Sequence, residues 1–449
     1  MQLVITAGGK GTRLKELTGG LPKPMVDVGG KPLLEHQVLL ARKYGIRDIL
    51  ILTGFGAEHI KQHFGDGAAW GVSISYQHEE QPLGTAGSLL NAFERLQDVF
   101  VMMYGDTLLN VDLRRMLAFH DTCVSATLFL HPNDHPQDSD LVELNSENQV
   151  QALHSYPHAP GQYFQNLVNA ALYVISKRAL TDVWQQWRQN LKALDVCRDL
   201  FPKLLAQGEI LQGYRSREYI KDAGTPVRLQ KVRRHYESGR VQAGSLETAL
   251  PAVFLDRDGT LNYDHGWIND PEKISLLPGA ADAIKAINDS GCLAVVVTNQ
   301  PVIARGECSE ARMQQIHNRL DWLLGEAHAY IDALYYCPHH PHSGFPLERR
   351  DLKIACDCRK PGTALLETAK QELNINLNRS WMIGDSDSDI RAATKFGIPA
   401  VLVNRNQGPN SEDHYSEPRL RSRTVSEAVN AVLNEQFSLQ PRPVVAQSQ

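Results

Sequence analysis

Two aspartates one residue apart, Asp256 and Asp258, could act together in one reaction. They lie in the segment FLDRDGTL at 254–261. On an extended chain the side chains at positions i and i+2 point the same way, so both carboxylates can face one substrate. Such a pair can divide the roles of nucleophile and general acid/base around a cation. The alternative is an ordinary loop, in which this spacing is common.

A second candidate site lies near the N-terminus, where AGGKGTRL occupies 7–14 and LPKPM occupies 21–25. Glycines let backbone N–H groups approach a phosphate, and a cation adds charge. A glycine loop alone could be a plain strand-to-helix turn. The prolines on both sides of Lys23 fix the backbone there, which suits a rigidly aimed phosphate-binding ammonium. Together the two segments predict a phosphate-binding site.

The spacing of cysteine and histidine in the second half indicates a metal site. A C-x-H pair and a C-x-C pair, with 16 residues between them, supply four soft ligands that suit tetrahedral zinc. The candidate ligands are Cys337, His339, Cys356 and Cys358. We expect a structural Zn²⁺ that pins a long loop. The alternatives are reduced surface thiols, or His340 or His342 in place of His339, and the other four cysteines are expected to be ordinary thiols.

Apolar, β-branched runs precede both phosphate-site candidates, at 3–6 and at 252–255. They predict the first strands of two domains, and the further predicted strands are 48–54, 72–77, 99–106, 125–130, 169–176, 293–300, 380–385 and 399–404. Helical patterns between most of them indicate parallel α/β sheets, with the sites outside the carboxyl ends of the strands. The predicted organisation is a domain at 1–235, a linker at 236–250, a domain at 251–410 and a polar extension at 411–449 with a frayed tail.

The composition excludes several classes of protein. The 449 residues are 42% hydrophobic and 22% charged, which rules out a disordered, collagen-like or coiled-coil chain. A net charge of −5 gives no basic footprint for nucleic acid or an anionic membrane, and no apolar run reaches the ~20 residues of a membrane span. The N-terminus shows no signal-peptide pattern, and seven cysteines do not suit a disulfide scaffold. We therefore expect a cytoplasmic protein with reduced thiols.

The first half, roughly 1–235, resembles the sugar-phosphate nucleotidylyltransferases, whose signature GGxGTRL…PKP matches 8–14 and 22–24. The resemblance implies a Rossmann-like domain in which a sugar 1-phosphate attacks the α-phosphate of a nucleoside triphosphate. Because both reactants are anions, cations must neutralise them and the developing charge. The implied phosphate contacts are Gly8, Gly9, Gly11, Thr12, Arg13 and Lys23.

The same resemblance implies further sites in the first half. Mg²⁺ would lie between Asp106 and Asp222, and Asn169 would contact a sugar hydroxyl. The base would be contacted by the stretch 81–87, including Gln81, Gly84 and Thr85.

One feature departs from that family. Many members carry a Glu-Lys-Pro shortly before the Asn-Ala strand, and its lysine grips the sugar phosphate. This chain has HSYPHAP at 154–160 instead. Lys221 or Arg217, close in sequence to the second metal aspartate, could replace that lysine, or both could be surface charges. The source of the sugar-phosphate contact stays open at this point.

The second half, roughly 250–408, resembles the haloacid dehalogenase phosphohydrolases, because DRDGT, VTN, RKP and GDSDSD follow one another in order. The resemblance implies a Rossmannoid domain in which Asp256 attacks phosphorus and Asp258 protonates the leaving oxygen and then activates water. The implied Mg²⁺ ligands are Asp256, Asp258 through its carbonyl, and Asp385, and the implied phosphoryl contacts are Thr298, Asn299 and Lys360. Asp389 is expected to orient Lys360 rather than to bind metal.

The zinc loop narrows this resemblance to the capless histidinol-phosphate and heptose-bisphosphate phosphatases, with Arg359 at the distal phosphate. Their usual TNQSGIARG is replaced by TNQPVIARG at 298–306, and the stiffer Pro-Val could alter the fit of the substrate.

The two halves would then catalyse consecutive steps on small-molecule substrates. Removing the 7-phosphate of a heptose 1,7-bisphosphate leaves a heptose 1-phosphate, which is the type of substrate that the first half takes. The resemblance thus implies a bifunctional enzyme of nucleotide-activated heptose synthesis, with GTP inferred from the pathway. The alternatives are a histidinol-phosphate-type phosphatase fused to an unrelated transferase, and a non-catalytic nucleotide sensor in the first half. By analogy with nucleotidylyltransferases, a homo-oligomer is also expected.

Overall fold

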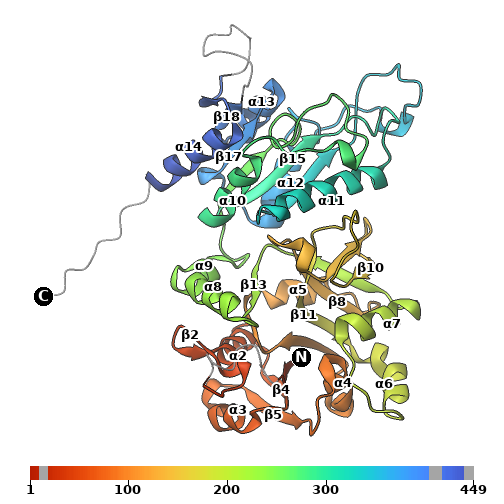
Figure 1. Ribbon diagram of the computed structural model, residues 1–449, viewed down its shortest axis with the longest axis vertical. Helices are drawn as coiled ribbons and strands as arrows, with labels where there is room; N and C mark the ends of the chain where they lie inside the picture. The colour runs from red at the N-terminus through yellow and green to blue at the C-terminus, as the bar shows by residue number, and fades with distance from the viewer. Residues whose placement is uncertain (10–18, 404–416, 439–449) are drawn as a thin grey trace, which may run out of the picture. The chain divides into compact units, whose positions relative to one another are not determined.

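The computed structural model describes residues 1–9, 19–403 and 417–438, which fall into two compact units (Figure 1). The first unit comprises 1–131, 139–158 and 167–248. The second comprises the chain from residue 249 onward, together with the short segments 132–138 and 159–166. Both units are α/β folds, as the sequence predicts.

The first unit is built on a nine-stranded sheet. Its path is β10-β9-β11-β6-β1-β4-β5, with β8 paired to β11 and β12 paired to β8. The strands are β1 (Gln2–Ala7), β4 (Asp48–Thr53), β5 (Ser73–His78), β6 (Val99–Tyr104), β8 (Ala126–His131), β9 (Leu141–Leu144), β10 (Val150–His154), β11 (Val168–Ser176) and β12 (Leu211–Arg215). The neighbours β6, β1, β4 and β5 are parallel, whereas β11 is antiparallel to β6 and β8. The sheet is therefore mixed rather than wholly parallel. Between β8 and β11 the described chain forms a short 3-10 turn and the antiparallel pair β9–β10, and no α-helix that could carry a parallel crossover.

Two helical layers cover this sheet because side chains alternate along each strand. On β1, Val4 packs in one core with α4 (Gly84–Asn91), α6 (Thr181–Trp187) and α7 (Phe201–Ala206). Leu3 and Ile5 pack in the other core with α2 (Leu33–Lys43), α3 (Ala57–Phe64) and α5 (Leu113–Phe119). The strand ends that carry the candidate site are thus held from both sides.

A smaller cluster completes the first unit. It joins the antiparallel pair β7 (Thr107–Asn110) and β13 (Tyr219–Asp222) to α8 (Pro226–Glu237), α9 (Arg240–Ala243) and the short pair β2 (Asp27–Val28) and β3 (Lys31–Pro32). Val241 of α9 and Leu246 are buried, and Glu218 accepts hydrogen bonds from the backbone N–H groups of Asp112 and Leu246. Of the predicted linker at 236–250, residues 236–248 are folded into the first unit.

The second unit is a three-layer sandwich around a parallel sheet of order β16-β15-β14-β17-β18-β19. The strands are β14 (Ala252–Leu255), β15 (Leu293–Asn299), β16 (Ala333–Cys337), β17 (Trp381–Gly384), β18 (Ala400–Val403) and β19 (Leu420–Ser422). One core contains α10 (Ala280–Ser290), α11 (Glu310–Glu326) and α14 (Val425–Ser438), and the other contains α12 (Ala364–Leu373) and α13 (Asp387–Phe396). This is the haloacid dehalogenase-like arrangement that the sequence predicts.

The C-terminal segment differs from the predicted extension. β19 pairs with β18, and Val425, Val429 and Val432 of α14 are buried against the sheet and α10. The apolar positions recur at helical spacing, which fixes α14 on the core. Residues 404–416 and 439–449, including the end of the predicted tail, lie outside the described residues.

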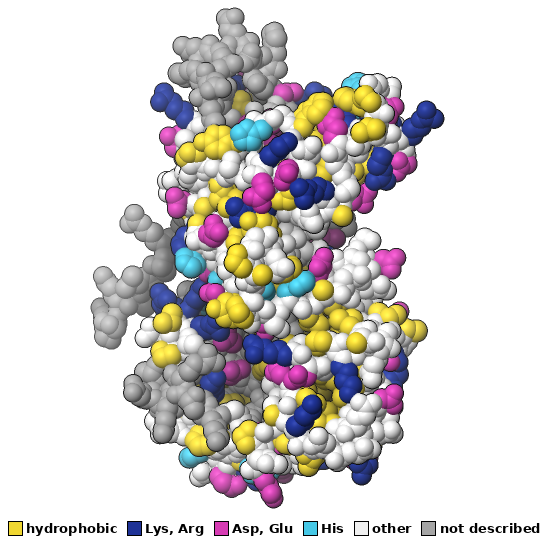
Figure 2. Space-filling view, turned by 45° about the vertical axis from the view of Figure 1, so that its right-hand side comes forward, with side chains coloured by type: hydrophobic (Ala, Val, Ile, Leu, Met, Phe, Trp, Pro, Cys, Tyr) yellow, Lys and Arg dark blue, Asp and Glu magenta, His cyan; other side chains and the backbone are white. Residues whose placement is uncertain are grey.

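The described helices include none that is long and apolar enough to cross a membrane. On the face drawn in Figure 2, Lys and Arg side chains are interspersed with Asp and Glu. That face therefore carries charges of both signs, in keeping with a net charge of −5.

Candidate functional site

The first candidate site lies at the carboxyl ends of the parallel strands β1 and β6. β1 runs into Gly8 and Gly9, and β6 runs into Gly105 and Asp106. The Gly105 N–H donates to the carbonyl of Thr6 over 2.9 Å, so the two loops lie side by side. The Glu79 carboxylate lies where a Cβ on Gly8 would stand, so the glycine leaves room for this side chain. The predicted phosphate contacts Gly11, Thr12 and Arg13 lie outside the described residues.

Three charged side chains that the sequence singled out meet at this edge. Lys23 Nζ lies 3.5 Å from Asp106 Oδ2. β13 brings Asp222 beside them, because the Ala223 N–H donates to the Asp106 carbonyl over 2.8 Å. All three charged groups lie next to Gly224. Measured from the position that a Cβ would take on Gly224, the distance is 2.9 Å to Asp222 Oδ2, 3.8 Å to Lys23 Nζ and 3.9 Å to Asp106 Oδ2.

The electrostatics of this cluster suit a cation. Burial raises the pKa of Asp106. The positive charge of Lys23 opposes this rise, whereas the negative charge of Asp222 adds to it, so the pKa of Asp106 stays above its ordinary value. Two carboxylates that repel one another in a partly buried site are stabilised by a divalent cation, and oxygen ligands are those that Mg²⁺ prefers.

The stretch predicted to contact the base starts α4. A Cβ on Gly84, where φ is +73°, would overlap the Leu194 carbonyl. The Thr85 hydroxyl donates to Asp195 over 2.9 Å and accepts from the Val196 N–H over 2.9 Å. These contacts fix the first turn of the helix against 194–196, while Gln81 is exposed. Contact with the base stays a prediction.

Asn169, the predicted sugar contact, lies on β11 with its amide held by a cysteine. Its Nδ2 donates to Cys197 Sγ over 3.1 Å, and Tyr173 Oη lies 3.3 Å from the same sulfur. Burial raises the pKa of Cys197 to about 12, so the thiol is protonated at neutral pH. Asn169 Oδ1 is buried and has no hydrogen-bond partner among the described residues. The sequence treats Cys197 as an ordinary thiol, and nothing in its local pattern indicates this contact.

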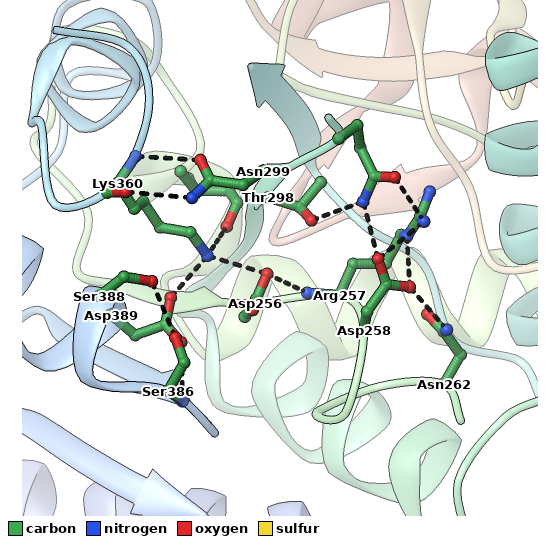
Figure 3. A network of polar contacts seen from close by, with 12 residues as sticks. Asp256, Arg257, Asp258, Asn262, Thr298, Asn299, Lys360, Ser386, Ser388 and Asp389 are labelled. Atoms are coloured by element: carbon green, nitrogen blue, oxygen red, sulfur yellow. Dashed lines mark hydrogen bonds and ion pairs between the residues drawn. The ribbon is translucent and has the colours of Figure 1, made fainter. Parts of the chain in front are cut away.

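The second candidate site lies at the carboxyl ends of β14, β15 and β17 (Figure 3). At its centre is Lys360, which is 3% exposed. Lys360 Nζ lies 2.8 Å from Asp256 Oδ1 and 2.6 Å from Asp389 Oδ1, and it donates to the Val297 carbonyl over 2.7 Å. Burial lowers the pKa of Lys360, but the two carboxylates outweigh burial and hold that pKa above its ordinary value.

Three carboxylates converge around this lysine. Oxygens of Asp256, Asp385 and Asp389 all lie within 4.8 Å of one another. Burial raises the pKa of Asp256, the positive charge of Lys360 opposes this rise, and the negative charge of Asp389 adds to it. The resulting pKa is about 6. Burial and the negative charges of Asp256 and Asp389 raise the pKa of Asp385 to about 8. Such mutual repulsion between hard oxygen ligands fits a bound divalent cation.

Asp389 and Gly259 have supporting positions in this cluster. Asp389 Oδ2 accepts from the Ser386 N–H over 3.1 Å and the Ser386 hydroxyl over 2.6 Å, in the first turn of α13. With its other oxygen on Lys360, Asp389 has the geometry expected of a residue that orients the lysine. A Cβ on Gly259 would overlap the Asp385 carboxylate, so glycine lets the two loops approach.

Asp258 is held away from Lys360 by a second polar network. Arg257 Nε and Nη2 donate to its two oxygens over 3.0 and 2.9 Å. Asn262 and Gln300 donate to the same carboxylate over 2.9 and 2.8 Å. Burial would raise the pKa of Asp258, but the fully buried Arg257 and these donors hold it below its ordinary value. Asp258 is therefore ionised in this arrangement.

Gln300 links this network to the predicted phosphoryl contact Thr298, whose hydroxyl accepts from Gln300 Nε2 over 2.9 Å. The sequence does not single out Arg257 or Gln300. Arg257 is a charged residue between two aspartates directly after a buried strand, which is the signal that could have indicated its role.

Asn299 and Arg359 have backbone partners. Asn299 Nδ2 donates to the Lys360 carbonyl over 3.1 Å, and Asn299 Oδ1 accepts from the Lys360 N–H over 2.9 Å. Asn299 thus positions the backbone of Lys360. Arg359 Nη1 lies 3.4 Å from the His339 carbonyl and ties this segment to the cysteine cluster. Contacts of either residue with a phosphate stay predictions.

The four predicted zinc ligands come together. Cys358 Sγ lies 3.2 Å from both Cys337 Sγ and Cys356 Sγ and 3.1 Å from His339 Nδ1. Among the described residues these four form one group of candidate metal ligands, and soft sulfur and imidazole donors fit zinc. His340 and His342 instead contact each other, with His340 Nδ1 3.1 Å from the His342 carbonyl. The structure therefore favours His339 over the two alternatives.

Comparison with known proteins gives a consistent result for both units. The family model for nucleotidyl transferases matches residues 2–239, and the HAD-hydrolase-like model matches 357–430. The chain is 37% identical over 161 residues to the D-glycero-beta-D-manno-heptose-1,7-bisphosphate 7-phosphatase of Escherichia coli, covering 36% of this chain and 82% of that protein. It is 41% identical over 165 residues to the phosphatase of the same name from Photorhabdus laumondii, covering 36% and 85%. The crystal structure of HddC from Yersinia pseudotuberculosis is 23% identical, with a TM-score of 0.45, and covers 52% of this chain and 99% of that one.

Proposed function

The chain belongs to the nucleotidyl transferase family and, through its second unit, to the HAD-type heptose-bisphosphate phosphatases, and from this premise we propose that it catalyses two consecutive steps of nucleotide-activated heptose synthesis. It is both a phosphatase and a nucleotidyltransferase. The proposed first step removes the 7-phosphate of a heptose 1,7-bisphosphate. The proposed second step transfers GMP from GTP to the resulting heptose 1-phosphate and releases pyrophosphate.

The observation that carries the proposal is that each unit holds its own charged centre at strand ends. Lys23 meets Asp106 in the first unit, and Lys360 meets Asp256 in the second. A phosphatase that acts on the distal phosphate makes a sugar 1-phosphate, and a nucleotidyltransferase consumes one. The chemistry of the two units is therefore sequential, and their fusion raises the local concentration of the intermediate.

In the phosphatase reaction, Asp256 is the proposed nucleophile. Its Oδ1 is held by Lys360 Nζ and by the Arg257 N–H, each over 2.8 Å, which leaves Oδ2 to attack phosphorus. The phosphorus–oxygen bond to the sugar breaks, and Asp258 gives a proton to the leaving oxygen. Asp258 then takes a proton from the water that hydrolyses the aspartyl-phosphate. Asp258 must first leave Arg257 and bind a proton, because its present partners keep it ionised.

Thr298 and Lys360 are proposed to bind the phosphoryl oxygens, and Arg359 the distal phosphate. Asp256, Asp385 and the Asp258 carbonyl are the proposed ligands of Mg²⁺, which would neutralise charge on the phosphoryl group when bound.

In the transferase reaction, an oxygen of the sugar 1-phosphate attacks the α-phosphate of GTP and the bond to pyrophosphate breaks. Lys23 and Arg13 are proposed to neutralise the phosphates, and the loop glycines to bind them through backbone N–H groups. Asp106 and Asp222 are the proposed ligands of Mg²⁺, which would supply further positive charge. Asn169 Oδ1 is buried without a hydrogen-bond partner among the described residues, and an acceptor left unpaired in this way supports the proposed contact with a sugar hydroxyl.

Two further assignments complete the proposal. Cys337, His339, Cys356 and Cys358 are proposed to hold a structural Zn²⁺ beside Arg359 and Lys360. A nucleoside triphosphate substrate and reduced zinc ligands fit the cytoplasm, and the transferase fold fits a homo-oligomer.

The test is a two-stage assay on the full chain. Phosphate release is measured from each anomer of heptose 1,7-bisphosphate with Mg²⁺, and GTP, ATP, CTP or UTP is then added in turn with detection of pyrophosphate. We expect phosphate first and then pyrophosphate with GTP. Pyrophosphate with another nucleotide would overturn the choice of GTP. Phosphate release without pyrophosphate from any nucleotide would overturn the second step.

Two variants separate the activities within that assay. Asp256→Asn should abolish phosphate release and keep pyrophosphate release from added heptose 1-phosphate. Asp106→Asn should do the reverse.

A further inference from the structure

The first unit must supply a cation for the phosphate of the sugar, and this inference rests on the proposed transferase function. No lysine or arginine stands anywhere between Arg115 and Lys177, so the stretch before Asn169 cannot provide one. In that stretch His154 pairs with Glu143 over 3.1 Å, and His158 Nε2 contacts the Ser139 carbonyl over 2.8 Å. The cation has to come from another element of the site.

The two cations nearest Asp222 in the upstream sequence are placed elsewhere. Lys221 is adjacent to Asp222 on β13, and adjacent residues of a strand point to opposite faces. Lys221 thus shares the face of Tyr219, whose hydroxyl contacts His235 over 3.1 Å, rather than the face of Asp222. Arg217 Nη2 donates to the carbonyls of Ser245 and Thr248, the latter over 2.7 Å. Arg217 therefore fastens the end of the first unit.

Unlike Lys221 and Arg217, Arg228 contacts the charged centre at Asp222. Its Nη1 lies 2.8 Å from Asp222 Oδ2, the same oxygen that faces Gly224 together with Lys23 and Asp106. The Arg228 side chain is 44% exposed, so a ligand arriving from solvent can reach it. Arg228 therefore borders the charged centre without being enclosed in it.

The helix around Arg228 gives no structural reason for a cation. Thr225 caps α8 and accepts from the Arg228 N–H over 3.3 Å, which puts Arg228 in the first turn. A positive charge in the first turn of a helix is disfavoured by the helix dipole, and an exposed ion pair contributes little to stability. The side chain is better explained by an anion that it binds.

We propose that Arg228 binds the phosphate of the sugar 1-phosphate and takes the part of the missing Glu-Lys-Pro lysine. Asp222 holds the guanidinium at the edge of the site, where it can pair with the incoming phosphate. The planar fork of arginine can donate two parallel hydrogen bonds to phosphate oxygens, which also orients the attacking group.

The test compares Arg228→Ala and Arg228→Lys with wild type and with the matched control Arg233→Ala. Arg233 lies on the same helix, and its Nε donates to the Asp27 carbonyl over 3.0 Å rather than to Asp222. KM is measured separately for heptose 1-phosphate and for GTP, and calorimetry measures binding of heptose 1-phosphate with Mg²⁺ but without GTP. We expect Arg228→Ala to raise the sugar KM and the calorimetric Kd at least tenfold, with the GTP KM within twofold of wild type. Arg228→Lys should recover part of the loss, and Arg233→Ala should match wild type.

Three results would overturn the inference while the wild-type protein remains active. One is an unchanged sugar KM and Kd in Arg228→Ala. Another is a rise confined to the KM for GTP, which would assign Arg228 to the triphosphate. The third is a lower Mg²⁺ requirement with unchanged sugar binding, which would make Arg228 only a counter-ion of Asp222. A wild-type protein that neither binds heptose 1-phosphate nor releases pyrophosphate from it would instead overturn the proposed function, and the inference with it.

Discussion

Lys360 Nζ lies 2.8 Å from Asp256 Oδ1, and both side chains are almost withdrawn from water. Asp389, fully buried, lies 2.6 Å from the same nitrogen. Lys360 thus balances two buried carboxylates at once, and its charge serves the stability of the second unit as well as the proposed binding of phosphate.

Replacing Lys360 by methionine should therefore affect both properties. We expect Lys360→Met to lower phosphate release by about 10²–10³-fold, because a preorganised charge at the phosphoryl group is lost. It should also destabilise the second unit by roughly 3–5 kcal/mol, because two buried carboxylates lose their partner. Phosphate assays and urea unfolding measure the two effects. Lys370→Met is the control, since Lys370 pairs with the half-buried Glu367 on the surface of α12 and lies outside the charged centre. Near-wild-type phosphate release in Lys360→Met would contradict the role.

From the raised pKa of Asp385 we predict that the stabilising effect of Mg²⁺ on the second unit grows with pH. Its pKa is raised to about 8 in the metal-free protein, by burial and by its acidic neighbours. The folded state then holds the proton more tightly than the unfolded chain, so stability is lost as the pH rises from the ordinary carboxyl range toward that pKa, by at most about 1.4 kcal/mol per pH unit. A divalent cation competes with this proton and should stabilise more at high pH.

The measurement is the melting temperature of the second unit with Mg²⁺ and with EDTA, near pH 5.5 and near pH 8.5. The difference in melting temperature between the Mg²⁺ and EDTA samples should be larger at the higher pH in the wild-type protein. In Asp385→Asn this difference should be smaller at both pH values. An equal difference at both pH values in the wild-type protein would show that no such proton is displaced.

The proximity of the four segments of the proposed phosphatase centre could be predicted, because they follow buried parallel strands or sit beside them. Carboxyl ends of parallel strands meet at one edge, so Asp256, Thr298 and Asp385 had to come together. The grouping of the four proposed zinc ligands could also be predicted, since close pairs of soft donors have few other uses.

Residues whose roles depend on how separate elements pack together could not be found in this way. Cys197 is 28 positions from Asn169, and only the packing of 194–200 against β11 brings its sulfur to the amide. Arg228 faces Asp222 because β13 and α8 fold back on each other. The antiparallel β11 and the buried α14 were missed for a related reason, because strand direction and helix docking are set by connections and partners rather than by local pattern.

From the cysteine cluster we predict that each chain binds one zinc ion, and that the ion is lost when one of the proposed ligands is replaced. Cys356→Ser should lower the zinc content measured by mass spectrometry to near zero. It should also reduce phosphate release at least tenfold, since Arg359 and Lys360 follow directly in the chain. Pyrophosphate release by the first unit should persist. The matched control is Cys308→Ser, because Cys308 is buried in the same unit but lies outside the cluster. Full zinc content in Cys356→Ser would rule out the ligand set.

We predict that changing Cys197 alters the KM for the sugar 1-phosphate selectively. Its sulfur accepts from Asn169 Nδ2 over 3.1 Å and so fixes the orientation of the amide, whose Oδ1 has no partner among the described residues. Valine is apolar, larger than cysteine by about one methyl group, and accepts no hydrogen bond, so Cys197→Val should leave the amide without its acceptor and a buried donor unpaired, at about 1–3 kcal/mol. We expect the KM for the sugar 1-phosphate to rise about tenfold, with the KM for GTP within twofold of wild type. Cys197→Ser, which keeps an acceptor, should stay within about threefold of wild type, and the exposed Cys123→Ser should show no change. Equal KM values for the sugar in Cys197→Val and Cys197→Ser would mean that the sulfur only fills space, because then the loss of its accepting lone pair has no consequence for Asn169.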